Sequence, residues 1–308
     1  MRVALTFPGQ GSQRPGMGQD WADTSVWSVV ASASEALGLD VGRLLLDADA
    51  EELRDTHNAQ VATYVTSMMA LDQMRQELPS LEVVAVCGHS LGEYSALAAA
   101  GAMSRDEGLR LVAARGTAMR AAATANPGTM AAVLGLSAEQ VEDALSLVED
   151  CWVANLNGPG NVIITGTTEG IAAGTKAATD AGAKRVLPLQ VGGAFHSPLM
   201  ADAAESLGVA LQETTWADSS VPVICNVDAT SHTSGPEWAG LLARQLTSPV
   251  RWTETLEALD RLGVDVVAEL GPGNVLTGIA KRVLPERAIA SVQTPNDVQK
   301  FGEILQGA

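Results

Sequence analysis

The fold is decided by the stretch Val83-Val84-Ala85-Val86-Cys87-Gly88-His89-Ser90-Leu91-Gly92-Glu93-Tyr94, in which a strand-forming apolar run meets a helix-forming run. Gly88-x-Ser90-x-Gly92 at such a junction is typical of a nucleophile elbow. Glycine is needed on both sides of the serine because side chains flanking so tight a turn would clash. We expect a strained backbone at Ser90, with its hydroxyl exposed beside the N–H groups of a helix N-terminus. The alternative is a glycine-rich strand–helix turn that carries a surface serine.

Composition favours an α/β protein that does not bind nucleic acid. The chain has 308 residues, of which 46% are hydrophobic and only 4% aromatic, so its core must be mainly aliphatic. Acidic residues number 36 against 19 basic ones, and a net charge of −17 repels phosphate backbones. An anionic ligand must therefore meet a local basic group.

Cysteine usage and hydropathy indicate a cytoplasmic protein. Cys87, Cys151 and Cys225 are far apart and form no C-x-x-C pair, which favours a reducing compartment without disulfides. The chain begins with the strand-like run Val3–Phe7 in place of a signal peptide, and no run is long enough to cross a bilayer. We expect no membrane partner and no metal site.

A small subdomain is predicted within a larger α/β body. The hydrophobic period changes after Asn126-Pro127-Gly128, and residues 126–193 then read as strand, helix, two strands, helix and strand, which is the ferredoxin-like order. Residues 1–125 and 194–308 form the body. Val264–Leu270 is a near-continuous apolar run, as expected in a parallel sheet covered on both faces.

Local signals predict further elements of the body. Helices are expected over residues 24–37, 50–56 and 59–78, and a strand over residues 221–227. The capping box Ser104-Arg105-Asp106-Glu107 begins a long helix that carries Arg115. Gly271-Pro272-Gly273 lacks the third glycine of a dinucleotide fingerprint, so we interpret it as a structural turn and expect no bound cofactor.

His196 is the predicted base for Ser90. A serine hydroxyl needs a base within hydrogen-bond reach, and the chain offers four histidines. His89 adjoins the serine on a turn where neighbouring side chains diverge, while His57, between two predicted helices, and His232, in a polar loop, are typical of surface residues. His196 follows two glycines where the subdomain rejoins the body. The alternative is a loop histidine whose hydrogen bonds are satisfied locally.

A missing aspartate and an arginine shape the rest of the predicted site. No aspartate stands at a strand end between Ser90 and His196, so we expect a backbone carbonyl to orient the histidine, and a plain Ser-His-Asp esterase is disfavoured. Arg115 lies among small apolar residues and needs an anionic partner if it is buried. The alternative is that Arg115 extends to the surface.

Five ordered motifs resemble those of the malonyl-CoA:acyl carrier protein transacylases, a family that includes the acyltransferase domains of polyketide synthases. The motifs are Phe7-Pro8-Gly9-Gln10-Gly11-Ser12-Gln13, Gly88-His89-Ser90-Leu91-Gly92-Glu93, Arg115-Gly116, Ala194-Phe195-His196-Ser197 and Gln245-Leu246-x-x-Pro249-Val250. The resemblance spans nearly the whole chain. It implies an α/β-hydrolase-like body with a mainly parallel sheet and an inserted ferredoxin-like subdomain.

The resemblance also implies a role for each site residue. Ser90 would become malonylated, and His196 would relay the proton. The backbone N–H groups of Gln10 and Leu91 would form the oxyanion hole. Arg115 would hold the malonyl carboxylate bidentately. The backbone carbonyl of Gln245 would orient His196.

The walls of the site bear on the choice of acyl group. Asn155 and Asn157 match asparagines of the family near the cleft. In the family that the chain resembles, a phenylalanine just before the histidine goes with malonyl and a serine with methylmalonyl, so the resemblance implies a malonyl preference at Phe195. The physical account is that a phenyl ring leaves little room for an α-methyl group. Leu91 bears on the same choice. Gly193 departs from the family pattern, since modular malonyl-loading domains often have histidine there.

Malonyl-CoA and an acyl carrier protein are therefore the expected partners, and the chain is expected to be a monomer. A thioesterase or serine hydrolase acting on acyl-CoA or acyl carrier protein, a trans-acting polyketide acyltransferase with another extender unit, and a non-catalytic carrier-docking module are the alternatives. Coenzyme A and the family's carriers are acidic, so we expect one of the basic groups Lys184-Arg185, Lys281-Arg282 or Arg251 to meet CoA phosphate or the carrier. Ordinary solvated surface charge is the competing interpretation.

Overall fold

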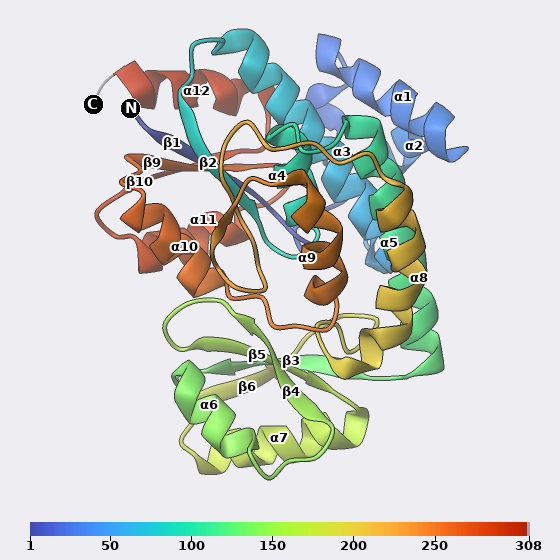
Figure 1. Cartoon of the computed structure of the whole chain (residues 1–308), viewed down its shortest axis with the longest axis vertical. Helices are drawn as coiled ribbons and strands as arrows, with labels where there is room; N and C mark the ends of the chain where they lie inside the picture. The colour runs from blue at the N-terminus through green and yellow to red at the C-terminus, as the bar shows by residue number, and fades with distance from the viewer. Residues whose placement is uncertain (307–308) are drawn as a thin grey trace.

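A computed structural model describes residues 1–306, which form two sheets of different kinds (Figure 1). The larger, six-stranded sheet is parallel except for its last pair. Its spatial order is β10 (Ala288–Val292), β9 (Val266–Leu270), β1 (Val3–Phe7), β2 (Val83–Gly88), β7 (Val223–Ile224) and β8 (Ser231–His232). The N-terminal strand thus lies at the centre, which confirms the predicted α/β class with a mainly parallel sheet.

Helices cover both faces of this sheet, as a parallel sheet requires. All five residues of β1 are buried, with Val3, Leu5 and Phe7 in one hydrophobic cluster and Ala4 in another on the opposite face. The body contains the helices α1 (Ser28–Leu37), α2 (Val41–Leu46), α3 (Thr56–Glu77), α4 (Gly92–Ala99), α5 (Arg105–Ala125), α8 (Ala201–Glu213), α9 (Trp238–Gln245), α10 (Trp252–Arg261), α11 (Val275–Val283) and α12 (Pro295–Gln306).

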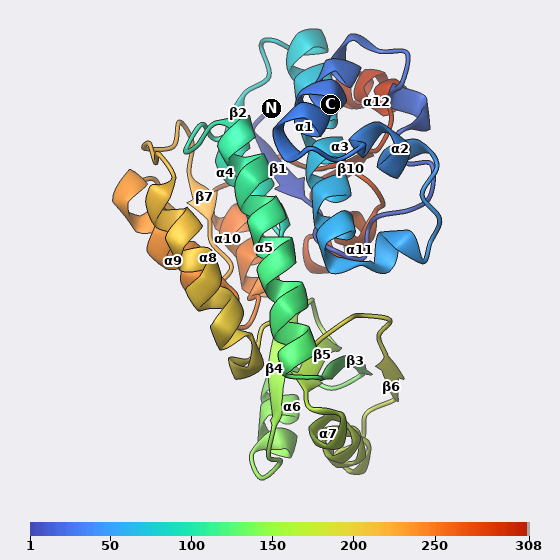
Figure 2. The ribbon, with the colours of Figure 1, turned by 90° about the vertical axis from the view of Figure 1, so that its right-hand side faces the viewer.

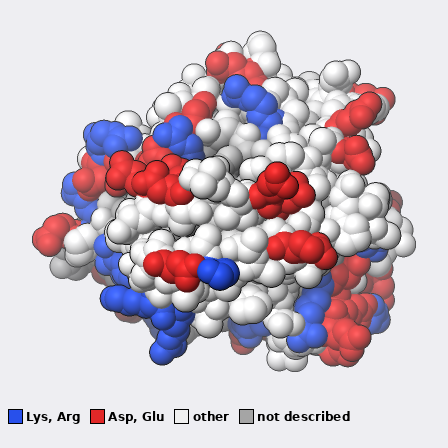
Figure 3. Space-filling model, turned by 90° about the horizontal axis from the view of Figure 1, so that it is seen from below, with Lys and Arg blue, Asp and Glu red and all other residues white. Residues whose placement is uncertain are grey.

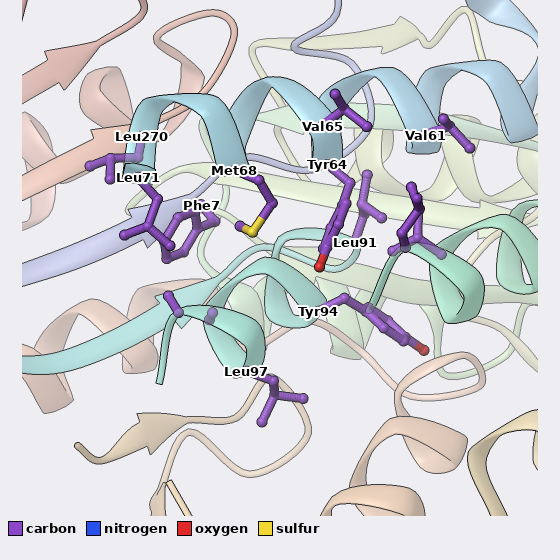
Figure 4. Packing of buried hydrophobic residues seen from close by; sticks show 14 of the residues in the cluster. Phe7, Val61, Tyr64, Val65, Met68, Leu71, Leu91, Tyr94, Leu97 and Leu270 are labelled. Carbon is purple, nitrogen blue, oxygen red and sulfur yellow. The ribbon is translucent and has the colours of Figure 1, made fainter. Parts of the chain in front are cut away.

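The elbow between β2 and α4 is packed without spare room. A Cβ atom added to Gly88 would lie 1.9 Å from the carbonyl atoms of Gly92, and one added to Gly92 would lie 2.0 Å from the carbonyl oxygen of Phe7. Figure 4 shows Tyr64 and Met68 of α3 reaching toward the start of α4, where Leu91 and Tyr94 are buried. Glycine at both positions is therefore a steric requirement.

The second sheet belongs to a small subdomain at the lower end of the molecule (Figure 1). It consists of β3 (Thr129–Leu134), α6 (Ala138–Leu145), β4 (Cys151–Leu156), β5 (Asn161–Gly166), α7 (Thr168–Asp180) and β6 (Arg185–Pro188). The strands are antiparallel in the order β4-β5-β3-β6, and they enclose a separate hydrophobic cluster with the two helices. This topology is the predicted ferredoxin-like arrangement.

Two connections hold the subdomain against the body. The long helix α5 runs from the body down to the subdomain, as Figure 2 shows. The end of β4 also bonds to the segment before α10: Val250 donates its N–H to Ala154 O at 2.8 Å and accepts from Leu156 N at 2.9 Å. The subdomain is therefore tied to the body by main-chain bonds as well as by chain continuity.

The local sequence signals predicted most elements but not all. The helix expected over residues 50–56 is only a 3-10 turn at Glu52–Arg54, and α2, which spans six residues and is capped by the side chain of Asp40, was not predicted. The strand expected over residues 221–227 has two ladder residues because the chain turns before Asn226. His57, expected between two helices, lies in the first turn of α3.

Within residues 1–306 all three cysteines are free and buried. No helix among those residues combines the length and the hydropathy that a membrane span requires.

The elbow glycines allow a stability prediction with an internal control. Gly88→Ala should lower the free energy of unfolding by about 3 kcal/mol or more, since backbone atoms block the added methyl group. Gly208→Ala, in α8, meets no atom within 4 Å and should raise it by about 1 kcal/mol because alanine favours helix. Urea unfolding of both variants measures the difference, and equal midpoints would contradict the steric argument.

Candidate active site

Ser90 lies at the turn of the elbow with a backbone φ of 52°. This left-handed conformation is costly for a residue with a Cβ and persists only where its surroundings impose it. It points the hydroxyl toward two groups: Oγ lies 2.8 Å from Nε2 of His196 and 2.9 Å from Nη2 of Arg115. The structure thus brings together three residues that are separated in sequence by up to 106 positions.

The hydrogen bonds of His196 define its tautomer. Nδ1 lies 3.0 Å from the carbonyl oxygen of Gln245 and 3.2 Å from that of Ser248. A carbonyl can only accept, so Nδ1 carries the proton and Nε2 is left as an acceptor. Ser90 therefore donates its hydroxyl proton to Nε2. The carbonyl of Gln245 occupies the place that a triad would give to an aspartate, as the missing acid indicated.

The charge state of His196 is set by burial and by Arg115. The imidazole is 5% exposed, and burial together with the nearby guanidinium lowers the pKa of His196 to about 3. Both causes disfavour the imidazolium form. His196 is consequently a neutral imidazole at physiological pH, which is the form a general base needs.

Arg115 is buried without a carboxylate partner. Its Nη1 donates to Gln60 Oε1 at 2.9 Å, its Nη2 donates to Gln245 Oε1 at 3.0 Å as well as to Ser90, and Tyr94 stacks with its ring centroid 5.5 Å from the guanidinium carbon. No Asp or Glu of residues 1–306 forms an ion pair with it, and Nε has no hydrogen-bond partner. The expected anionic partner is thus not part of the described chain.

The predicted oxyanion donors are the backbone N–H groups of Gln10, which lines the same cavity as Ser90, and of Leu91, the next residue in the chain. Within residues 1–306, neither the N–H of Gln10 nor that of Leu91 has an internal hydrogen-bond partner. The N–H of Ser90 is by contrast occupied, because it donates to Asn226 Oδ1 at 2.7 Å. Two unpaired N–H groups beside the hydroxyl can stabilise a developing negative charge.

A cavity of about 470 Å³ opens at Ser90, between the body and the subdomain. Its polar lining comes from both parts, with Gln10 and Arg115 of the body and Asn155 and Asn157 of the subdomain. Apolar side chains complete its walls, namely Met119, Met130, Ile163, Leu189, Val191, Phe195, Val275, Leu276 and Ile279. A cavity of this volume accommodates a small acyl group and part of its carrier arm.

Two predicted site residues contribute no side chain to the cavity. Gln245, whose carbonyl meets His196 as expected, does not line the cavity. It is fully buried and its side-chain Nε2 donates to Ser90 O at 2.9 Å. Gln245 therefore positions Ser90, His196 and Arg115 through hydrogen bonds without lining the cavity. Leu91 likewise contributes no side chain to the cavity, so only its backbone can act there.

Other residues behave as supports of this arrangement. His89 bonds through Nε2 to Asn157 Oδ1 at 2.9 Å and packs edge-on against Trp252, in agreement with its predicted supporting position. Gly193 packs on α5, where an added Cβ would lie 2.6 Å from Ala123 Cβ and 3.2 Å from the ring of Phe195. This contact explains why no histidine stands at position 193.

Sequence reasoning missed Gln60 and Asn226. Both are fully buried polar residues, and each hydrogen-bonds to a member of the site. Gln60 is the one amide among the buried residues of α3, so its position in the helix was a signal, but its partner at Arg115 could not be read from the sequence. Asn226 lies two residues after the end of β7, but its partner at residue 90 could not be read from the sequence. The described residues contain no cluster of metal-ligating side chains.

Comparison with known proteins gives consistent matches over the whole chain. The family model described as acyl transferase domain matches residues 5–299. Proteins named malonyl CoA-acyl carrier protein transacylase from Haemophilus influenzae and Bacillus subtilis are each 39% identical, over 98% and 97% of this chain and 98% and 95% of theirs.

Solved structures agree. An acyl-carrier-protein S-malonyltransferase from Burkholderia pseudomallei superposes with a TM-score of 0.94 at 36% identity, covering 98% of this chain and 100% of that one. A malonyl-transacylase in complex with a type II polyketide synthase acyl-carrier protein superposes with a TM-score of 0.94 at 37% identity, covering 98% and 99%.

The pKa of His196 can be tested directly by NMR. We expect its imidazole signals to show no titration between about pH 5 and 8, whereas an unperturbed histidine titrates near pH 6.5. Arg115→Ala should raise the pKa of His196, because a positive charge that disfavours the imidazolium is removed. Arg120→Ala, on the exposed side of the same helix, is the matched control. Equal effects of the two substitutions would show that Arg115 does not act on the histidine.

Proposed function

The chain belongs to the acyl transferase family, and from that premise we propose how its residues transfer a malonyl group from malonyl-CoA to the phosphopantetheine thiol of an acyl carrier protein. The observation that carries the proposal is the position of one hydroxyl, Ser90 Oγ, within 3 Å of both an imidazole acceptor and a guanidinium donor. The reaction runs in two halves through a malonyl ester of Ser90.

His196 handles the proton in both halves. In the first, Ser90 Oγ attacks the thioester carbon while Nε2 of His196 takes the hydroxyl proton, and then the C–S bond breaks and the proton passes to the CoA thiolate. In the second, His196 takes the proton of the carrier thiol, the thiolate attacks the serine ester, and the proton returns to Oγ as the C–O bond breaks. The hydrogen bond from Nδ1 to Gln245 O keeps the required tautomer throughout.

Gln10 and Leu91 stabilise the tetrahedral oxyanion in each half through their backbone N–H groups. The support for this assignment is that both groups lack an internal partner while that of Ser90 is used by Asn226. Loss of one oxyanion donor typically raises the barrier by roughly 3 to 4 kcal/mol.

Arg115 selects acyl groups that carry a terminal carboxylate. Its Nη2 points at Ser90 and its Nε is unpaired, so this edge of the guanidinium can bind both carboxylate oxygens of a malonyl group attached at the serine. Because Gln60 and Gln245 are neutral, they orient the guanidinium without cancelling its charge. A lysine would supply charge without the fork.

The same charge links substrate binding to the base. Arg115 is among the causes that lower the pKa of His196. A carboxylate bound to Arg115 offsets that charge, so it raises the pKa of His196 toward the value of a competent base. Bound malonyl-CoA therefore makes His196 a stronger base, whereas an acetyl group, which has no carboxylate, would leave the pKa of His196 low.

The cavity walls limit the acyl group further. Phe195 is nearly buried next to His196 and lines the cavity, so its ring restricts the space for an α-methyl group. One methyl group is worth about 1 to 3 kcal/mol, hence the preference for malonyl over methylmalonyl is partial. Asn155, 6% exposed on β4, offers a polar contact on the facing wall.

A transfer assay with malonyl-CoA and a holo acyl carrier protein tests the proposed roles. Ser90→Ala should abolish both the malonyl adduct seen by intact mass and the transfer, with a loss on the order of 10³-fold or more. In the same assay Arg115→Ala should lose about a hundredfold in kcat/KM for malonyl-CoA, as expected for two charge-assisted bonds, and should accept acetyl-CoA better. Phe195→Ser should gain activity with methylmalonyl-CoA.

The controls separate transfer from hydrolysis. Arg115→Lys keeps the charge and tests whether the fork geometry matters. Malonyl-CoA consumption that does not depend on carrier protein would favour the thioesterase alternative, and transfer retained by Ser90→Ala would refute the assignment of the nucleophile.

For the carrier protein, we propose docking at a basic rim formed by Lys184, Arg185, Lys281 and Arg282. Lys184 lies over Gly135, whose N–H bonds to Gly160 O at 2.9 Å, and Gly158 of the same turn faces α11, the helix that carries Lys281 and Arg282. Val275, Leu276 and Ile279 of α11 line the cavity, which supports a position of the basic pairs near its mouth. Figure 3 shows that basic and acidic side chains are interspersed on the face at this end, which leaves local positive groups on an acidic protein.

Charge reversal tests the rim. Lys281→Glu with Arg282→Glu should raise KM for the carrier protein severalfold, about 1 kcal/mol for two exposed charges, and leave kcat unchanged. Arg110→Glu, near the far end of α5, is the matched control. A rise in KM for malonyl-CoA alone would assign the rim to the CoA phosphates, and no change in either KM would remove it from consideration.

A further inference from the structure

At the elbow, the side chain of Asn226 makes the two hydrogen bonds that the main chain of a neighbouring strand would make. β2 and β7 pair in parallel with Val86 opposite Val223 and Cys87 opposite Ile224, so continuing the register would set residue 226 opposite His89. A residue in that position donates its N–H to the carbonyl of residue 88 and accepts from the N–H of residue 90. The side-chain amide of Asn226 makes these two bonds: Nδ2 donates to Gly88 O and Oδ1 accepts from Ser90 N, both at 2.7 Å.

There is a geometric reason why a side chain, and not a main chain, makes these two hydrogen bonds. The ladder stops at Ile224 because β2 bends into the elbow, and a main chain in register could not follow it. A carboxamide has the donor and acceptor of a peptide group on a longer arm. It therefore spans the two backbone groups on either side of His89 and fixes the turn that carries the nucleophile.

The backbone N–H of Asn226, released from the ladder, donates to Glu93 Oε2 at 2.8 Å. Glu93 is fully buried in the first turn of α4, three residues after the nucleophile. Burial raises the pKa of Glu93 to about 7. Glu93 belongs to α4, the helix of the elbow. Its hydrogen bond to Asn226 therefore links Asn226 to the same elbow that the side chain of Asn226 stabilises.

We propose that Asn226, held by Glu93, is a positioning residue that clamps the nucleophile elbow and reserves the N–H of Leu91, and not that of Ser90, for the oxyanion. The inference rests on the malonyl transfer set out above. It predicts that loss of the clamp slows acylation of Ser90 while malonyl binding, which depends on Arg115, is retained.

The sharpest variant is Asn226→Asp, which is isosteric but cannot donate to Gly88 O when ionised. We expect kcat for acylation to fall about a hundredfold at pH 8, the effect of displacing a reacting group by about 1 Å, with KM for malonyl-CoA changed less than about threefold. Rapid-quench intact mass follows formation of the malonyl adduct. Near-ultraviolet circular dichroism confirms that the variant is folded.

The pH profile supplies a readout that a merely structural role would not move. The introduced carboxyl group would be buried beside Glu93, so we expect burial and the carboxylate of Glu93 to disfavour its ionised form and the charge of Arg115 to favour it. Once protonated, the group can donate to Gly88 O again, so the activity of the variant should recover as the pH falls. Asn296→Asp makes the same chemical change on exposed α12 and should match the unaltered chain.

The results distinguish a failure of the clamp proposal from a failure of the proposed function. If the unaltered chain and Asn296→Asp form no malonyl adduct, the proposed function fails. If they form it and Asn226→Asp acylates within about twofold of them at every pH, or loses malonyl binding in parallel, the clamp is overturned. Should Asn226→Asp not fold, Glu93→Gln decides: it keeps an acceptor for Asn226 N and should retain acylation within about threefold, whereas a loss beyond tenfold would refute a hydrogen-bonding clamp.

Discussion

The structure depends on a chain reversal at residues 88–92 in which backbone approaches backbone. Any side chain at Gly88 or Gly92 would overlap main-chain atoms, and Ser90 between them is forced to a φ of 52°. Such strain persists only where neighbours determine it, and here they do so from the centre of a sheet. The direction of one hydroxyl is consequently set by the close-packed junction of β2 and α4, and the imidazole of His196 and the guanidinium of Arg115 are brought to it.

A second principle is the management of one buried charge. Neutral amides hold Arg115, so its charge is oriented without being cancelled. The uncancelled charge of Arg115 also acts on His196, because the guanidinium lowers the pKa of that imidazole. An unpaired buried charge is normally destabilising. In this site the uncancelled charge of Arg115 favours an acyl group with a carboxylate over one without. Binding of that carboxylate and the basicity of His196 then change together.

The elements that carry the chemistry could be predicted because local patterns determine them. The elbow follows from glycine spacing, and the capping box at Ser104 with its helix follows from hydrogen-bonding rules. That a backbone carbonyl takes the place of an aspartate was predictable from the missing acid, whereas its assignment to Gln245 came from the family resemblance. Asn226 and Gln60 were not predictable, because their partners are 136 and 55 positions away and no local rule connects a buried amide to a distant backbone group. The six-residue α2 is too short for its period to be recognised.

The central place of β1 has a consequence for synthesis. The first strand pairs on one side with β2 and on the other with β9, whose last residue is Leu270 of 308. Synthesis must therefore reach β9, more than 250 residues after β1, before the middle of the larger sheet can close. Until then β1 exposes an apolar edge, which is the condition under which chains aggregate or engage chaperones. The subdomain, encoded in one continuous segment, can fold long before the body that surrounds it.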